Sequence, residues 1–146
     1  MKKQDNSIGI IPVHKTDDGP WLFCAILQCQ GHWTFPKGHP DAGEAKITTA
    51  KRELFEETGL MAEEIWPDKV LIEKYSFEKE GVGYDKTVEY FIGLVNSTKI
   101  AIPQEFKQEI KDARWGTAEE IRQLLTFSSI KEVFEEVIVT LSERHK

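Results

Sequence analysis

Cysteine and long apolar runs are both scarce in this sequence. Its 146 residues include only Cys24 and Cys29, so the chain must fold without a framework of disulfides. Their odd separation in an apolar run predicts opposite faces of one strand, and we interpret both as core thiols in a reducing compartment. No apolar stretch approaches the ~20 residues of a membrane helix, and the charged start lacks the apolar run of a secretory signal. We therefore expect a cytoplasmic protein that has no membrane partner.

An excess of positive charge is also missing. The chain has 25 Asp and Glu against 19 Lys and Arg, which gives a formal net charge of -6. Duplex nucleic acid is therefore not expected as the main partner, because broad phosphate contact needs clustered Lys and Arg. A phosphorylated small molecule remains compatible with this balance, since acidic side chains hold cations and the cations hold phosphate.

The residues that are present suit a single globular domain over residues 1–146, at 40% hydrophobic and 30% charged. Apolar patterns predict strands at residues 7–14, 21–29, 33–35, 70–77, 86–96 and 113–115, and helices at 45–58, 117–125 and 129–142. Residues 36–43 and 79–85 are predicted loops because they are rich in turn-forming residues. This mixture predicts a layered α/β (α+β) fold, and we expect a monomer.

Two helix ends carry local signals. Gly59 follows the last helical residue of the central helix and predicts its C-terminal end. Thr117, with Glu120 three residues on, predicts a capping box at the start of the next helix.

The central predicted helix carries three acids on one face. Glu53, Glu56 and Glu57 stand at i, i+3 and i+4, so they repel one another, and the negative end of the helix dipole disfavours them further. A solvated surface, partly neutralised by Lys51 and Arg52, is one explanation. The other is a divalent-cation site, because hard cations such as Mg²⁺ take carboxylate oxygens and keep waters and phosphates as their remaining ligands.

Residues 38–60 resemble the Nudix box. That pattern is Gly, five residues, Glu, seven residues, Arg-Glu, an apolar residue, one residue, Glu-Glu, one residue, Gly and an apolar residue. Every fixed position is matched here, by Gly38, Glu44, Arg52, Glu53, Leu54, Glu56, Glu57, Gly59 and Leu60. The chain is identified as a member of the Nudix hydrolase family, which implies a mixed β-sheet sandwiched between helices.

The resemblance implies a role for each acid of the helix. Glu53, Glu56 and Glu57 would be the ligands of Mg²⁺ or Mn²⁺, and Arg52 would orient Glu53 through an ion pair. Arg52, Glu53 and Glu57 are therefore expected among the catalytic residues. Bound metal would neutralise diphosphate charge, polarise phosphorus and lower the pKa of the attacking water.

Other box residues would have supporting roles. Gly38 would allow a tight loop whose backbone carbonyl, near Lys37, reaches the metal. Glu44 would lie near the start of the helix, where the dipole favours a carboxylate, and would support the loop or the metal. Gly59 would end the helix.

Segments outside the box resemble one group of the family, the asymmetrical diadenosine tetraphosphate hydrolases. The sequence W-T-F-P-K-G-H stands at residues 33–39, and K-T-V-E-Y-F stands at residues 86–91. Glu109 lies six residues before Trp115, and Phe127 lies eighteen residues after Glu109. That group has a glutamate and an aromatic residue at these spacings.

These matches imply a set of substrate contacts. Lys37, His39 and Lys86 would bind phosphate, and Tyr90 would lie beside the substrate. Phe127 would stack on adenine, a contact worth ~1–3 kcal/mol per base. Tyr90 and Phe127 are both also explained as core residues.

Two assignments stay open. Tyr75 and Phe77 lie on the same face of a predicted strand, and either can form the second wall of an aromatic clamp. Glu109 either binds the metals or acts as the general base. A carboxylate near two cations stays ionised, so it accepts a proton only from a water of lowered pKa.

The implied activity is metal-dependent hydrolysis of dinucleoside polyphosphates, with diadenosine tetraphosphate giving ATP and AMP. Removal of the 5′ pyrophosphate from RNA is an alternative that uses the same site, although it needs a basic surface. Inositol pyrophosphates are a further alternative and would need more Lys and Arg around the pocket. A catalytically silent nucleotide-binding module usually has a broken box, whereas this box is complete.

Overall fold

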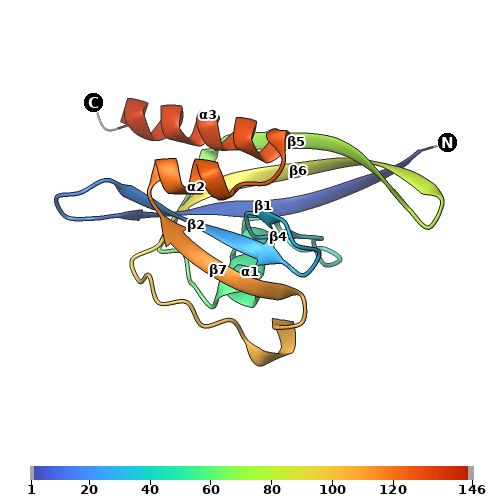
Figure 1. Ribbon diagram of the computed structural model, residues 1–146, viewed down its shortest axis with the longest axis horizontal. Helices are drawn as coiled ribbons and strands as arrows, with labels where there is room; N and C mark the ends of the chain where they lie inside the picture. Colours follow the sequence, from blue (N-terminus) through green and yellow to red (C-terminus); the bar gives the residue numbers. More distant parts are fainter. Residues whose placement is uncertain (1, 145–146) are drawn as a thin grey trace.

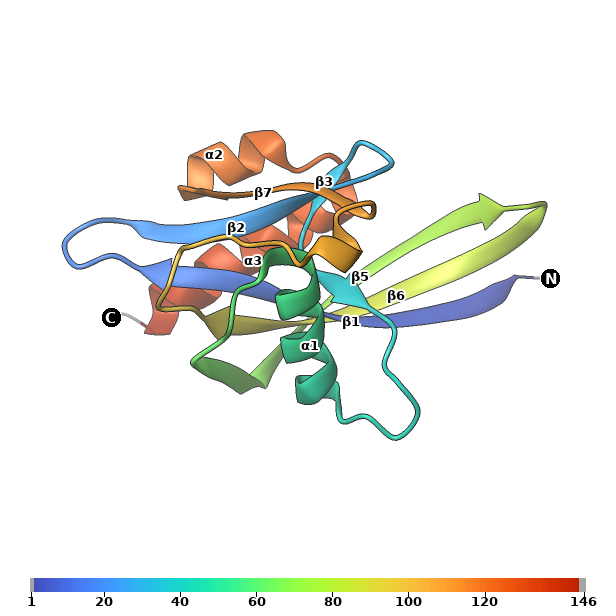
Figure 2. The ribbon, with the colours of Figure 1, turned by 90° about the horizontal axis from the view of Figure 1, so that it is seen from below.

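The computed structural model describes residues 2–144 and shows a mixed β-sheet with helices on both faces (Figure 1, Figure 2). The strands are β1 (Lys3–Lys15), β2 (Trp21–Gln28), β3 (Trp33–Thr34), β4 (Lys37–Gly38), β5 (Glu64–Lys79), β6 (Val82–Leu94) and β7 (Ile110–Gly116). The helices are α1 (Lys46–Thr58), α2 (Ala118–Leu124) and α3 (Ser128–Arg144), and Gln104–Phe106 forms a 3₁₀ turn. The predicted α+β fold, with its sheet between helices, is confirmed.

Strand β1 lies at the centre of the sheet, whose main order is β3-β2-β1-β6-β5. It runs parallel to β6, from Lys3 opposite Tyr84 to Val13 opposite Leu94, and antiparallel to β2. The short strand β4 pairs with Ile8 and Gly9 of β1. These residues lie closer to the N-terminus than residues 13–15, which pair with β2. This pairing brings the first residue of the box to the middle of the sheet.

Both faces of the sheet are covered, so the molecule has two apolar layers. Ile10 and Ile11 are consecutive on β1 and both fully buried, because alternate residues of a strand point to opposite faces. Ile10 belongs to the layer under α1, with Ala50 and Leu54. Ile11 belongs to the layer under α2 and α3, with Phe134. This double burial explains the near-continuous apolar runs of β1 and β2.

The β5–β6 hairpin and the start of β1 extend beyond the helices (Figure 2). The rings of Phe77 and Tyr84 stack across the hairpin, with centroids 5.1 Å apart and planes at 11°. Glu80 and Gly81 close it with φ values of 52° and 79°, as a two-residue turn that suits the twist of paired strands requires. The predicted loop over residues 79–85 is right only in part, because it contains this turn but cross-strand pairing continues up to it.

The ends of the helices follow their local signals. Gly59 has left-handed φ of 78° and ends α1. The Thr117 hydroxyl accepts from the backbone N–H of Glu120, whose carboxylate accepts from the backbone N–H of Thr117, so the capping box at α2 is confirmed. The predicted loop over residues 36–43 is right only in part, because Lys37–Gly38 pairs with β1.

The two cysteines lie in different environments. Cys24 is buried, as predicted, and desolvation raises the pKa of its thiol to about 12. Cys29 is exposed, so its prediction as a core thiol is wrong. Strand β2 ends at Gln28, one residue before it, and Cys29 lies in the turn that follows. Among the helices of residues 2–144, none is both long and apolar enough to cross a membrane.

Candidate active site

Helix α1 places the three predicted ligands near its C-terminal end. Glu53 and Glu57 are each only 7% exposed, whereas Glu56 is partly exposed. Ala50 and Leu54 of the same helix pack on the sheet, and this contact sets how the helix is rotated. Two carboxylates are thus largely shielded from water.

Arg52 contacts three of the box glutamates. Its Nε and Nη2 donate to the two oxygens of Glu44, at 2.9 and 3.0 Å. Its Nη1 donates to Glu53 at 3.0 Å and to Glu56 at 3.2 Å, and Nη2 also donates to the carbonyl of His39 at 2.9 Å. These contacts raise the pKa of the guanidinium, with the bonds to Glu44 contributing most. The ion pair predicted between Arg52 and Glu53 is present.

Glu44 ties the loop before α1 to the helix. Besides Arg52, it accepts from the backbone N–H of Asp41 at 3.0 Å and from the hydroxyl of Thr49 at 2.7 Å. The bonds from Arg52 above all lower the pKa of Glu44 to about 2. Its oxygens are therefore engaged in supporting the loop, as the first of its two predicted roles requires.

Gly38 allows Glu53 to approach the backbone of the sheet. A Cβ added at Gly38 would overlap the carboxyl group of Glu53. Gly38 belongs to β4 rather than to the tight loop that the sequence predicts. Glycine is thus needed here for the close approach of a side chain, and a larger residue would displace Glu53.

Burial and mutual repulsion act together on the acids of α1. Desolvation raises the pKa of Glu53 to about 7, and repulsion from Glu56 adds to this rise. Desolvation also raises the pKa of Glu57 well above its ordinary value, and repulsion from Glu53 adds to it. The backbone N–H of Lys37 donates to Glu57 at 3.1 Å and opposes that rise only in part.

Glu109 approaches the same acids from a distant part of the sequence. It lies in an exposed turn before β7, and its backbone carbonyl accepts from the N–H of Cys29 at 2.8 Å. Its negative charge contributes to the raised pKa values of both Glu53 and Glu57. The fold therefore brings Glu109 and the α1 acids together.

The donor set around α1 suits a hard divalent cation. The candidate ligands are carboxylate oxygens, which Mg²⁺ and Mn²⁺ prefer, and a cation beside them would restore the charged forms that burial disfavours. Within residues 2–144, no three Asp, Glu, His or Cys side chains converge closely enough to enclose an ion by themselves. Waters and substrate phosphates would therefore complete the coordination, as is usual for Mg²⁺.

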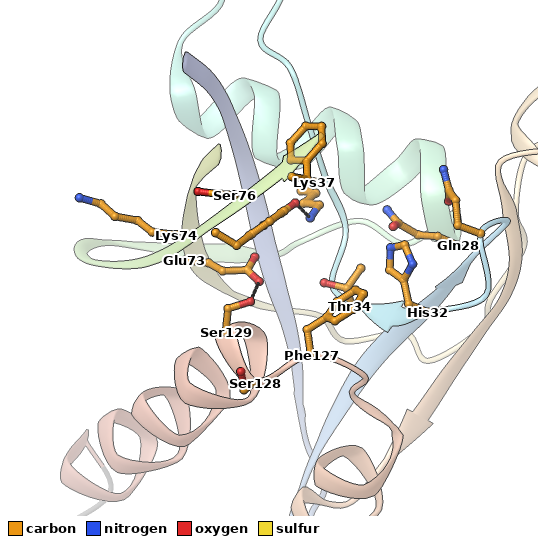
Figure 3. Close-up of a pocket in the computed structure, with 13 residues that line it drawn as sticks. Gln28, His32, Thr34, Lys37, Glu73, Lys74, Ser76, Phe127, Ser128 and Ser129 are labelled. Atoms are coloured by element: carbon orange, nitrogen blue, oxygen red, sulfur yellow. Dashed lines mark hydrogen bonds between the residues drawn. The ribbon is translucent and has the colours of Figure 1, made fainter. Parts of the chain in front are cut away.

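A cavity of about 680 Å³ is shown in Figure 3, and none of the α1 acids belongs to its lining. It is bounded by the ends of β2 and β3, by the first residue of β4, by residues 73–77 of β5 and by the start of α3. Its lining residues are Gln28, Gln30, His32, Thr34, Lys37, Glu73, Lys74, Tyr75, Ser76, Phe77, Phe127, Ser128 and Ser129. This volume is typical of a small-molecule site.

Aromatic rings stand on both sides of the cavity. Phe127 is 51% exposed, and its ring centroid lies 5.1 Å from that of His32. Tyr75 and Phe77 line the cavity from β5, with ring centroids 6.1 Å apart. Both candidates for the second wall are therefore present, and Tyr75 is the one that contacts Lys37. Phe127 is not a core residue.

Lys37 connects this cavity to the acids of α1. Its backbone N–H donates to Glu57, while its Nζ donates to the Tyr75 hydroxyl at 3.0 Å and lies 5.2 Å from the centre of that ring. One residue thus touches both regions.

A second lysine lies close to the first. Lys86 is buried, and its Nζ donates to Asp5 at 3.0 Å and to Ser7 at 2.6 Å. Desolvation lowers the pKa of Lys86, and the positive charge of Lys37 lowers it further. His39 Nε2 lies 2.6 Å from the other carboxylate oxygen of Asp5. Of the three predicted phosphate-binding residues, Lys37 lines the cavity, whereas Lys86 and His39 are joined to each other through Asp5.

Tyr90 lies in the core and not in the cavity wall, so the prediction of direct substrate contact is wrong. It is fully buried and packs edge-on against Phe35. Its hydroxyl donates to Glu73 over 3.4 Å, and desolvation raises its pKa well above the ordinary value.

Sequence reasoning predicts only Lys37, Tyr75, Phe77 and Phe127 among the lining residues, and the polar ones that it misses include Glu73 and Ser129. Their side chains join in a hydrogen bond of 2.7 Å. A signal for Glu73 exists, because it shares a strand face with Tyr75 and Phe77. Ser129 has no such signal, since only the packing of α3 on β5 brings it there.

A family model for the NUDIX domain matches residues 4–138. The chain therefore belongs to the Nudix family and is a Nudix hydrolase, as the box predicts. The asymmetrical bis(5′-nucleosyl)-tetraphosphatase of Mus musculus is 37% identical over 128 residues, which cover 85% of this chain and 83% of that protein. The enzyme of the same name from Sus scrofa is 34% identical over the same shares. Phosphatase NudJ of Escherichia coli K12 is 32% identical over 62% of this chain and 55% of its own.

Solved structures agree with this fold. An Ap4A hydrolase binary complex from C. elegans superposes with a TM-score of 0.77 at 23% identity, covering 95% of this chain and 98% of that one. The NUDIX domain of Shewanella oneidensis NrtR, complexed with ADP ribose, gives a TM-score of 0.75 at 16% identity, covering 97% and 90%.

Proposed function

We propose that this protein hydrolyses dinucleoside polyphosphates in a metal-dependent reaction, with diadenosine tetraphosphate giving ATP and AMP. The observation that carries the proposal is Lys37, which touches both the aromatic cavity and the buried acids of α1. A base in the cavity and a phosphate chain running past Lys37 would reach those acids. The relatives named for the asymmetrical cleavage of such compounds support this substrate class.

The α1 acids would hold Mg²⁺ or Mn²⁺, and Nudix hydrolases generally use divalent metal ions. Glu53, Glu56 and Glu57 are the proposed ligands, and the backbone carbonyl near Gly38 is a further one. When bound, the metal neutralises phosphate charge and activates phosphorus toward water. Arg52 keeps Glu53 and Glu56 in place through its fixed fork of donors.

The remaining residues bind substrate and move a proton. Lys37, Lys86 and His39 would contact the phosphate chain, and Phe127 with Tyr75 would stack on a base. Glu109 is exposed, and its negative charge acts on Glu53 and Glu57. We therefore propose that Glu109 is the general base that accepts the proton of the attacking water. We also propose that the chain is a single domain, since the family match spans residues 4–138, and that it works as a monomer.

The test is an assay of the purified protein with Mg²⁺ and three substrates: diadenosine tetraphosphate, diadenosine triphosphate and a 5′-triphosphorylated RNA. We expect the tetraphosphate to be cleaved to ATP and AMP and the RNA to be a poor substrate. Rapid processing of the RNA without turnover of the tetraphosphate would contradict the proposal.

A further inference from the structure

The floor of the cavity contains a buried carboxylate that the proposed chemistry does not use. Glu73 stands on β5 and is only 3% exposed, yet it lines the cavity. Its Oε2 accepts from the Ser129 hydroxyl at 2.7 Å, and its Oε1 is 3.4 Å from the hydroxyl of Tyr90. Figure 3 shows Glu73 and Ser129 facing each other beside Phe127 and Thr34.

These two contacts leave Glu73 with unused acceptor capacity. An ionised carboxylate has about four lone-pair sites and no donor, and the contact with Tyr90 is long for an O–H···O bond. None of the ion pairs formed within residues 2–144 involves Glu73. A buried polar group of this kind gains most from a ligand that brings its own donors.

We propose that Glu73 reads the edge of a purine in the cavity and makes the cavity bind guanine more tightly than adenine. The inference rests on the proposed function for its ligand class, a nucleotide. Guanine presents two adjacent donors on its pairing edge, the ring N1–H and the 2-amino group, and a carboxylate accepts both. Adenine presents one amino donor beside the N1 acceptor, whose lone pair is repelled by the carboxylate. Phe127 stands two residues before Ser129, so a base stacked on its ring has this carboxylate nearby.

The first test measures binding of guanosine, inosine and adenosine 5′-monophosphates to the wild-type protein in Mg²⁺ by calorimetry. These ligands contain no phosphoanhydride bond, so no reaction intervenes. Inosine keeps the N1–H and lacks the 2-amino group. We expect affinity to fall in the order guanosine, inosine, adenosine, with about tenfold or more between the first and last, as one bidentate contact to a base supplies. Equal affinities, or tighter adenosine binding, would overturn the inference.

The second test replaces Glu73 by glutamine. An amide offers one acceptor and one donor, which match the amino group and N1 of adenine, and it can still accept from Ser129. Glu73→Gln is therefore expected to reverse the preference in favour of adenosine. Glu78→Gln is the matched control, because Glu78 lies on the same strand, is exposed and is outside the cavity. A purely structural Glu73 would give a variant that weakens all three nucleotides equally, and that result would overturn the inference.

The binding series separates this inference from the proposed function. If the guanosine preference is present while dinucleoside polyphosphates are not hydrolysed, the base reading by Glu73 stands and the proposed activity fails. If hydrolysis is rapid and the series shows no preference, the activity stands and the base reading fails. A thermal unfolding curve checks that Glu73→Gln is folded, and the wild-type series decides the base preference without any variant.

Discussion

The acids of α1 and the cavity beside them differ in what the protein supplies. Glu53 and Glu57 are buried close to other acids, and the hydrogen-bond donors around them do not compensate. Desolvation and mutual repulsion therefore raise the pKa of both carboxyl groups. Around the cavity the protein supplies aromatic surface and a hydrogen-bonded polar floor. The first region would gain from a bound cation, whereas the second offers aromatic rings on which a flat ring could stack. The two regions together suit a molecule with a base at one end and a metal-bound phosphate chain at the other.

The largest expected effect comes from a change in the acids of α1. Glu57→Gln keeps the shape of the side chain and removes one charge, so turnover of diadenosine tetraphosphate should fall by roughly 10²–10³, the size seen when one electrostatic group is removed from an active site. Mononucleotide binding in the cavity should be nearly unchanged.

The control for Glu57→Gln is Glu105→Gln, an exposed acid of the 3₁₀ turn. Steady-state assays of both variants check the prediction. Full activity in Glu57→Gln would show that the buried acid is not a ligand.

Arg52→Lys should give the next largest loss. Lysine keeps the positive charge but cannot reproduce the fork that contacts Glu44, Glu53 and Glu56. Loss of a residue that orients ligands typically costs ~10–100-fold in metal affinity or activity. Titration of activity with Mg²⁺ should show a higher requirement for the metal. An unchanged requirement would mean that Arg52 serves only stability.

Phe127→Ala tests the cavity side. Stacking on one ring is worth ~1–3 kcal/mol, which corresponds to roughly 5–100-fold in affinity, so KM should rise while kcat stays close to wild type. Val139→Ala on the exposed side of α3 is a control with similar exposure. Loss of the fold in Phe127→Ala, seen in thermal unfolding, would instead place this side chain in the core.

The smallest expected effect is on how the free energy of unfolding depends on pH. The folded-state pKa of Glu53 is about 7 and that of Glu57 is also raised, so the folded protein binds more protons than the unfolded chain above the ordinary pKa of about 4.3. The free energy of unfolding should therefore fall as pH rises from about 4.3 to 7. Mg²⁺ should reduce this fall, because it stabilises the ionised acids.

Urea unfolding at pH 5 and pH 7.5, with and without Mg²⁺, measures this effect. Glu44 acts in the opposite sense, since its pKa is lowered to about 2 and its contribution is lost only as pH falls toward that value. A stability that rises between pH 5 and 7.5 without metal would contradict the burial of Glu53 and Glu57.

The two regions also differ in how far the sequence predicts them. Glu53, Glu56, Glu57 and Arg52 lie within two turns of one helix, so fixed spacing is enough to bring them together. The cavity is assembled from β2, β3, β4, β5 and the start of α3, and no spacing along the chain relates Glu73 to Ser129. Tyr90 shows the same limit, because here the sequence predicts a site residue that the structure places in the core. Its motif marks it as interesting, but only the packing of β6 against Phe35 decides that it is buried.

The account's central claim is that the cavity and the acids act on one substrate. The most direct test compares diadenosine tetraphosphate with inorganic tetrapolyphosphate, which has similar anhydride bonds and no base, at equal Mg²⁺. The account predicts that the dinucleotide is cleaved to ATP and AMP with a much higher kcat/KM than the inorganic chain, and that Phe127→Ala narrows the difference. Equal kcat/KM values for the two compounds would contradict it, because the cavity would then have no part in the reaction.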